Sequence, residues 1–160
     1  MGTISSSLGT VSSTIGTTSS SSSTNGSIAS SSSDGTVRIF DSLSGVCLLT
    51  LEHDGMVLST HFSPDSRRLV TATLGGETVV WSVETGDKLM VLIDGASTTA
   101  LTRCLFSPDG HLVATAFDSG SVQLWDTRSG NMSVNCKMTS VVQVKFSPSS
   151  HFMACGTRDG

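Results

Sequence analysis

Four histidines are the side chains of this 160-residue chain best suited to metal binding or acid–base chemistry: His53, His61, His111 and His151. His111 and His151 follow equivalent turns of a repeated phrase, where side chains are expected to face solvent. Asp109 is the one carboxylate at ligand spacing from either of them, and a single His–Asp pair rarely makes a metal site. We therefore predict structural or solvated histidines, with no metal site and no cofactor.

Other catalytic signatures are missing from the sequence, which contains no nucleophile elbow, phosphate loop or dinucleotide-binding glycine pattern. Gly75-Gly76 is typical of a hairpin turn, because glycine adopts positive φ at little cost. The cysteines lack C-x-x-C spacing, which favours free thiols over two disulfides; they are Cys47, Cys104, Cys136 and Cys155. We predict that the chain is not an enzyme and has no catalytic residues.

Composition and charge narrow the class of partner. The formal net charge is −4 and no block of Lys or Arg occurs, which argues against binding nucleic acid by phosphate neutralisation. No apolar run approaches the ~18 residues that span a bilayer, and the amino terminus lacks a signal-peptide pattern. We expect an intracellular protein, cytoplasmic rather than nuclear, that binds neither nucleic acid nor membrane.

The elements that would position any functional side chain are short strands. A phrase recurs at residues 61–65 (HFSPD), 105–109 (LFSPD) and 145–149 (KFSPS), at spacings of 44 and 40 residues. Apolar runs of period two, separated by turn residues, flank each phrase and predict strands. The predicted strands are residues 37–40, 46–51, 57–62, 68–73, 78–81, 101–106, 112–117, 121–125, 132–136, 141–146 and 152–155.

A period of about 40–45 residues with these marks is the signature of WD40 repeats. In that family the third strand of each blade ends in Trp-Asp, and here the matching pairs are Phe40-Asp41, Trp81-Ser82 and Trp125-Asp126. The chain resembles this family over residues 27–160. The resemblance implies an all-β, partial WD40 β-propeller of four-stranded antiparallel blades: residues 27–52 (partial), 53–96, 97–137 and 138–160 (partial).

Residues 1–26 are the exception. Of residues 1–33, 21 are Ser or Thr, and the first charge is Asp34. This segment has too little apolar surface to offset the conformational entropy that it would lose on folding. We therefore predict that residues 1–26 form a disordered Ser/Thr-rich tail.

The resemblance also implies structural residues inside the blades. Many WD40 blades contain a hydrogen-bonded group of His, Ser or Thr, Asp and Trp, and no blade here contains all four. Matched blade by blade, the family's hydroxyl position falls on Ser32, Thr73, Phe117 and Thr157. The structural residues expected are Asp34, His53, Thr73, Trp81, Trp125, Asp126 and Asp159.

Within the family, the chain resembles the propeller of WD repeat, SAM and U-box domain proteins, notably at residues 76–86 and 90–109. This resemblance implies selection of substrates for a ubiquitin ligase whose catalytic segment lies outside these residues. The partner would be a protein or peptide held by the loops at one end of the blades. The expected contact residues are Met56, Leu74, Glu77, Ser97, Thr98, Arg103, Ser119, Lys137 and Arg158, with Arg103 and Arg158 as anchors.

The sequence is also compatible with other roles. The chain could be a generic WD40 scaffold in trafficking, RNA processing or signalling, or a truncated gene product that does not fold alone. Propellers usually close with about 4–8 blades. We therefore expect a fragment whose remaining blades come from a longer chain, the alternative being closure with another copy.

Overall fold

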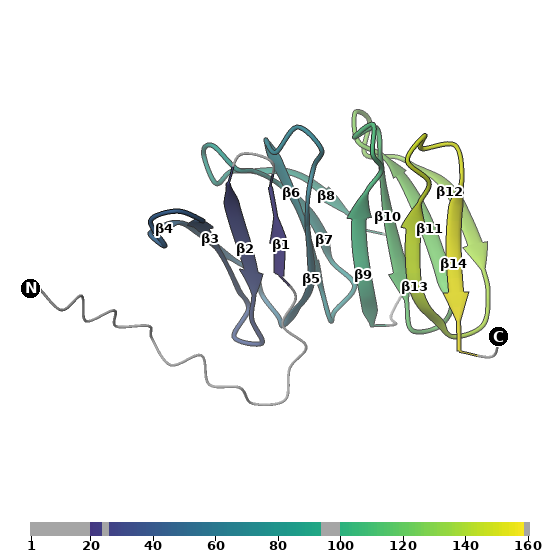
Figure 1. Cartoon of the computed structure of the whole chain (residues 1–160). Helices are drawn as coiled ribbons and strands as arrows, with labels where there is room; N and C mark the ends of the chain where they lie inside the picture. The colour runs from purple at the N-terminus through teal and green to yellow at the C-terminus, as the bar shows by residue number, and fades with distance from the viewer. Residues whose placement is uncertain (1–19, 24–25, 94–99, 159–160) are drawn as a thin grey trace, which may run out of the picture.

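The computed structural model describes residues 20–23, 26–93 and 100–158. Within these residues, fourteen strands form four antiparallel sheets that follow one another in chain order (Figure 1). The all-β class and the four-stranded sheets predicted from the sequence are confirmed. We call the sheets the first to fourth blades.

Each blade is a meander in which consecutive strands pair. The first contains β1 (Ser20–Ser22), β2 (Ser27–Ser31), β3 (Thr36–Asp41) and β4 (Cys47–Glu52). The second contains β5 (Val57–Phe62), β6 (Arg68–Thr73), β7 (Thr78–Ser82) and β8 (Lys88–Leu92). The third contains β9 (Leu101–Phe106), β10 (Leu112–Phe117), β11 (Ser121–Asp126) and β12 (Met132–Lys137). The described part of the fourth contains β13 (Val141–Phe146) and β14 (Met153–Thr157).

The first strand, β1, corrects the sequence interpretation. It lies inside residues 1–26, predicted to be disordered, and pairs with β2 in the register Ser21↔Ala29. The first blade therefore has four strands, where the sequence indicated three. The rest of the predicted tail, residues 1–19 and 24–25, lies outside the described residues.

The repeated Ser-Pro-Asp phrase forms the turn between the first and second strands of a blade. The Ser63 hydroxyl donates to the Asp65 carboxylate and accepts the Arg68 N–H at 2.9 Å. Ser107 makes the same bonds to Asp109 and to the Leu112 N–H. The phrase recurs because one short side chain closes this turn each time.

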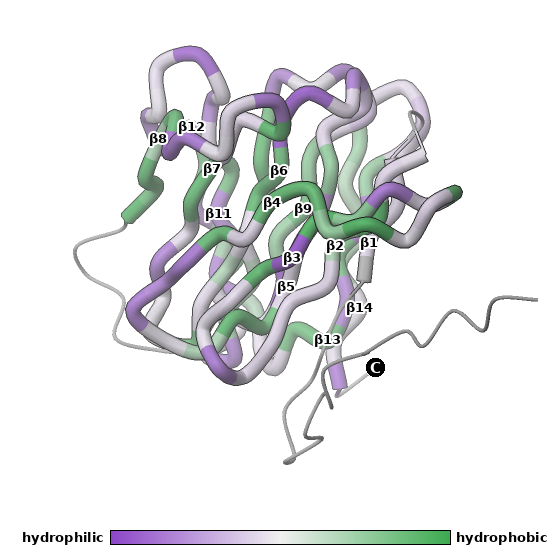
Figure 2. The backbone as a smooth tube through the Cα atoms, turned by 90° about the vertical axis from the view of Figure 1, so that its left-hand side faces the viewer, coloured by the Kyte–Doolittle hydropathy of each residue, from purple (hydrophilic) through white to green (hydrophobic). Residues whose placement is uncertain are grey.

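Hydrophobic cores lie between neighbouring blades, at contacts that we call the first, second and third joints. Figure 2 shows hydrophobic residues mainly on the strands. Their buried side chains form one cluster at each joint. The first joint buries Ala29, Val37, Ile39, Leu51, Val57, Phe62, Leu69, Val79 and Trp81. The second buries Val70, Ala72, Val80, Leu92, Leu101, Cys104, Phe106, Val113, Phe117 and Trp125. The third buries Ala114, Ala116, Val122, Val141 and Val144.

The turn between the second and third strands of a blade depends on glycine at one position. Gly120 has φ +87°, and a Cβ atom there would lie 2.0 Å from the Met138 carbonyl oxygen. That carbonyl belongs to the loop that enters the fourth blade. The close approach of two backbones therefore excludes any side chain at residue 120.

Replacing Gly120 with alanine should lower the free energy of unfolding by at least about 1–3 kcal/mol, because positive φ and the backbone clash both oppose the new Cβ. Denaturant unfolding followed by tryptophan fluorescence measures the change. The control is Gly75→Ala in the equivalent turn of the second blade, where the nearest atom is a Thr73 oxygen at 3.9 Å. Equal losses in the two variants would contradict the argument.

Candidate protein-binding face

Loops at one end of the blades form a row, which we call the loop face. It comprises residues 32–35, 53–56, 74–77, 118–120 and 138–140, with Ala100 and Arg158. Among the described residues, backbone hydrogen bonds join these loops in two groups, one over the first and second blades and one over the third and fourth. The His53 N–H donates to the Gly35 carbonyl at 3.0 Å, and the Leu74 N–H to the Met56 carbonyl at 2.8 Å.

The same pattern continues over the third and fourth blades. The Asp118 N–H donates to the Ala100 carbonyl at 2.9 Å, and the Met138 N–H to the Gly120 carbonyl at 2.9 Å. The Arg158 N–H donates to the Ser140 carbonyl at 3.0 Å. These bonds fix the spacing of the loops, so their side chains project from a largely preformed surface.

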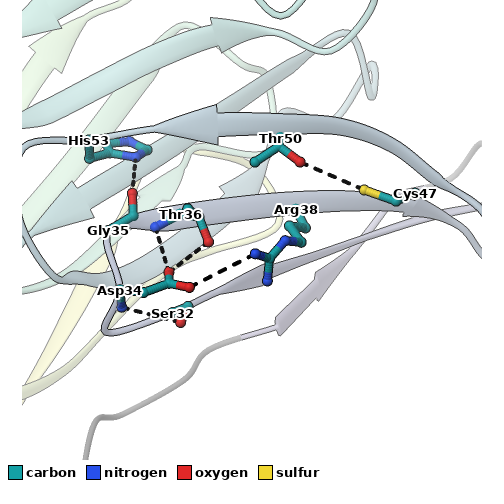
Figure 3. A network of polar contacts seen from close by, with 8 residues as sticks. All are labelled: Ser32, Asp34, Gly35, Thr36, Arg38, Cys47, Thr50 and His53. Atoms are coloured by element: carbon teal, nitrogen blue, oxygen red, sulfur yellow. Dashed lines mark hydrogen bonds and ion pairs between the residues drawn. The ribbon is translucent and has the colours of Figure 1, made fainter. Parts of the chain in front are cut away.

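His53 anchors the loop that enters the second blade. Its Nδ1 lies 3.3 Å from the Gly35 carbonyl oxygen, which can only accept, so Nδ1 carries the proton (Figure 3). Nε2 then accepts from the Thr71 hydroxyl at 2.8 Å, and the same oxygen accepts the Trp81 indole N–H at 2.9 Å. Burial lowers the pKa of His53, which matches this neutral form.

Thr71 corrects the assignment of the hydroxyl to Thr73. The register pairs Trp81 with Leu69, so the next residue on that face of β6, Thr71, is within reach of the indole. Thr73 lies two residues farther along, and its oxygen accepts the Glu77 N–H at 3.2 Å in the turn.

The third blade repeats this geometry. Trp125 is buried and donates its indole N–H at 3.0 Å to Thr115, so Thr115 takes the place assigned to Phe117. In both blades the threonine stands ten residues before the tryptophan. This common spacing is the signal in the sequence that identifies the bonded hydroxyl.

The two described structural aspartates stabilise turns. Asp34 Oδ1 accepts the Thr36 N–H at 2.9 Å and the Thr36 hydroxyl at 2.6 Å, which lowers the pKa of Asp34 (Figure 3). Asp126 Oδ1 accepts the Ser129 N–H at 2.8 Å and the Arg128 N–H at 2.9 Å, which lowers the pKa of Asp126. Asp126 is the last residue of β11, before the turn to β12, at the opposite end of the blades from the loop face. Asp159 lies outside the described residues.

The expected contact residues divide by position. Met56 and Glu77 are half-buried in adjoining loops, which the Leu74–Met56 bond brings together. Lys137 ends β12 and Arg158 follows β14, and both are exposed beside residues 138–140.

Leu74 and Ser119 are exposed in the turns at residues 74–77 and 118–120. Arg103 is exposed but lies on the innermost strand, β9, rather than in a loop. Ser97 and Thr98 lie outside the described residues. The role of all these residues in binding stays a prediction.

The side chains considered for chemistry have local structural contacts. The Asp109 carboxylate accepts the His111 N–H at 3.0 Å, and His151 Nδ1 lies 2.7 Å from the Ser149 carbonyl. Burial raises the pKa of the Cys104 thiol to about 12, so this sulfur is a poor nucleophile. Among the described residues, no three His, Cys, Asp or Glu side chains lie close enough to hold a metal ion, and no helix is long and apolar enough to cross a membrane.

The sheets and their repeated turns define a bladed β-repeat protein, and comparison with known proteins identifies the family. The family model described as "WD domain, G-beta repeat" matches residues 5–41, 45–82 and 87–126. The chain therefore belongs to the WD40-repeat family, whose members are generally non-catalytic protein-interaction scaffolds. Each matched segment ends where β3, β7 or β11 ends.

Curated relatives are longer than this chain. It is 31% identical to the target of rapamycin complex subunit wat1 of Schizosaccharomyces pombe, over 68% of the chain and 34% of that protein. It is 28% identical to serine-threonine kinase receptor-associated protein of Dictyostelium discoideum, over 78% of the chain and 42% of that protein. It is 32% identical to human striatin-4, over 82% of the chain and 19% of that protein. The chain thus spans less than half of each of these relatives.

Thr71→Val should destabilise the second blade by about 1–3 kcal/mol, because the variant leaves the Trp81 indole N–H and His53 Nε2 without their shared partner. Thr71→Ser keeps the hydroxyl and is the matched control. Urea unfolding of the two variants measures the difference. A Thr71→Val loss no larger than the Thr71→Ser loss would argue against this role.

Stability should fall as the solution is acidified. The pKa of folded His53 is below 6.5, its ordinary value, so the unfolded chain binds the proton more readily. The stability that neutral His53 contributes is fully present above about pH 6.5, and it is lost as the pH falls through the pKa of His53 in the folded chain. Unfolding free energies measured from pH 5 to 8 should show a smaller slope for His53→Gln than for the unmodified chain. An unchanged slope would exclude His53 as a source of the dependence.

Proposed function

We propose that this chain recognises a protein or peptide segment through its loop face and catalyses no reaction. The observation that carries the proposal is the row of backbone-linked loops, because a preformed surface loses little conformational freedom when it binds. Leu74 and Met138 are 46% and 39% exposed on this face and offer apolar contacts among charged side chains. An apolar centre with a polar rim is the usual anatomy of a protein interface.

Charge on the face favours a partner with charges of both signs. Asp34 and Asp54 are exposed near the first joint, whereas Lys137 and Arg158 are exposed at the third. Separated charges of opposite sign orient a bound segment, because the reversed orientation places like charges together. Arg103, exposed on β9, adds a further positive charge on the third blade.

The binding test compares two double variants by affinity capture from an extract of the source cells. The Lys137→Glu, Arg158→Glu variant should capture at least about tenfold less of the bound protein, because it reverses both charges at the positive end of the face. The control is Arg67→Glu with Arg128→Glu, which reverses two exposed charges at the opposite end of the blades. Equal capture by both variants and the unmodified chain would overturn the proposal, provided that circular dichroism shows both variants folded.

The resemblance to WD repeat, SAM and U-box proteins supports a narrower role, as the substrate-recognition part of a ubiquitin ligase. This role stays a prediction. The competing candidate is a scaffold in another assembly, which is favoured by the names of two relatives: the target of rapamycin complex subunit and a pre-mRNA-processing factor 19 homologue of Arabidopsis thaliana, 27% identical over 139 residues. Ubiquitin transfer to the captured protein, lost in the Lys137→Glu, Arg158→Glu variant, would distinguish the two roles.

A further inference from the structure

At the second joint, polar contacts link β5 to β9, the first strands of the second and third blades. These strands belong to different sheets, so no backbone ladder joins them. The Cys104 N–H donates to the Ser59 hydroxyl oxygen at 3.2 Å, joining β9 to β5. Two residues along each strand, the Phe106 N–H donates to His61 Nδ1 at 3.2 Å. Both acceptors are side chains, so the contact between these strands depends on the chemistry of two residues.

The bond to His61 exists in only one protonation state of the ring. Nδ1 accepts a hydrogen bond through its lone pair, which a proton would occupy in the imidazolium form. The equivalent residue in the third blade is Leu105, which packs against the apolar core of the third joint. A titratable acceptor therefore takes the place of an apolar contact at the second joint.

We infer that His61 is a proton-sensitive connection between the second and third blades, closed when its ring is neutral and released when the ring is protonated. Release leaves the Phe106 N–H facing a cation that cannot accept it. The blades are then held at this point by the Ser59–Cys104 contacts and by the apolar core. The inference concerns the joint itself and stands whether or not the loop face binds a protein.

The surroundings of the ring favour the neutral form. Burial lowers the pKa of His61 below 6.5, against a smaller opposite effect of the Phe62 backbone. The titratable side chains on the strands packed against β5 are Arg68 of β6 and Arg103 and Cys104 of β9, while β1 and β2 have none. Neither arginine can stabilise an imidazolium, since like charges repel.

Two turn carboxylates, Asp65 and Asp109, lie at the ends of β5 and β9. Both are engaged by turn hydroxyls, of Ser63 and Ser107.

The joint also sets the spacing of two loops. Residues 74–77 belong to the second blade and residues 118–120 to the third, so a change in the angle between these blades moves the loops relative to each other. Arg68 reinforces the same joint in both protonation states of His61. Its Nη2 donates to the Gly110 carbonyl at 3.1 Å, and its guanidinium lies 5.3 Å from the centre of the Phe106 ring. Release is therefore expected to loosen the joint locally rather than to separate the blades.

Amide hydrogen exchange, corrected for the intrinsic effect of pH, tests the inference on the 160-residue chain. Between pH 7.5 and pH 5.0, the protection of the Phe106 amide should fall about five- to tenfold, the effect of losing one hydrogen bond. Ala114, in the central part of the same blade, is the reference amide and should lose much less. Equal changes at the two amides, or no protection of Phe106 at pH 7.5, would overturn the inference.

Two variants assign the effect to His61 rather than to His53 at the first joint. His61→Asn places an amide oxygen near the position of Nδ1 and does not titrate, so protection of Phe106 should become independent of pH. His61→Leu copies the third blade and should give low protection at both pH values. A pH dependence that survives in His61→Asn would refute the assignment. If either variant fails to fold, the comparison of Phe106 with Ala114 in the unmodified chain still decides.

Discussion

The structure depends on apolar burial between blades, because a single four-stranded sheet has two apolar faces and can bury neither alone. In β7, Val79 and Trp81 face the first blade, whereas Val80 faces the third. Strand β7 therefore reads as a continuous apolar run instead of alternating with polar residues. Each blade is stable because its neighbours cover it, which is the general condition of repeat proteins. The turns and loops take their positions from this stacking.

At the first joint, hydrogen bonds link Trp81, Thr71 and His53, and these bonds extend the order of the core to the loop face. Thr71 lies in the buried region, and its hydroxyl connects Trp81 in the core to His53 in the loop above. His53 in turn contacts the Gly35 carbonyl of the first blade. A buried indole N–H without a partner would cost about 1–3 kcal/mol. Thr71 therefore serves two purposes: it accepts the buried indole N–H, and it holds the loop that contains His53. The position of this part of the loop face thus follows from the hydrogen bonds that the buried polar groups require.

The repeated phrase predicted most of the strands because it places a turn at the same point of each blade. The phrase alone did not distinguish Thr71 from Thr73, since both lie on one face of β6; the ten-residue spacing to tryptophan, shared by the second and third blades, separates them. Nor could the phrase predict β1, because a strand of three serines has no apolar alternation and is defined by its pairing with β2. The contact residues remain predictions for a different reason: the fold sets where loops lie, whereas binding depends on the side chains that each loop happens to carry.

The joints use similar apolar side chains but different polar bonds, and this difference matters for the order of the blades. The first joint is bridged by His53 and Gly35, the second by His61 and Phe106, and the third by Ser150, whose hydroxyl oxygen accepts the Asp109 N–H at 3.1 Å. Apolar faces of similar size tolerate exchange, because hydrophobic contact is non-directional. A misplaced neighbour would break these bonds, at a cost that is larger for the partly buried bonds of the first and second joints than for the exposed bond of the third. The polar residues that differ between blades therefore favour one neighbour for each blade. They help to specify the order in which the blades pack, which the shared apolar pattern alone does not determine.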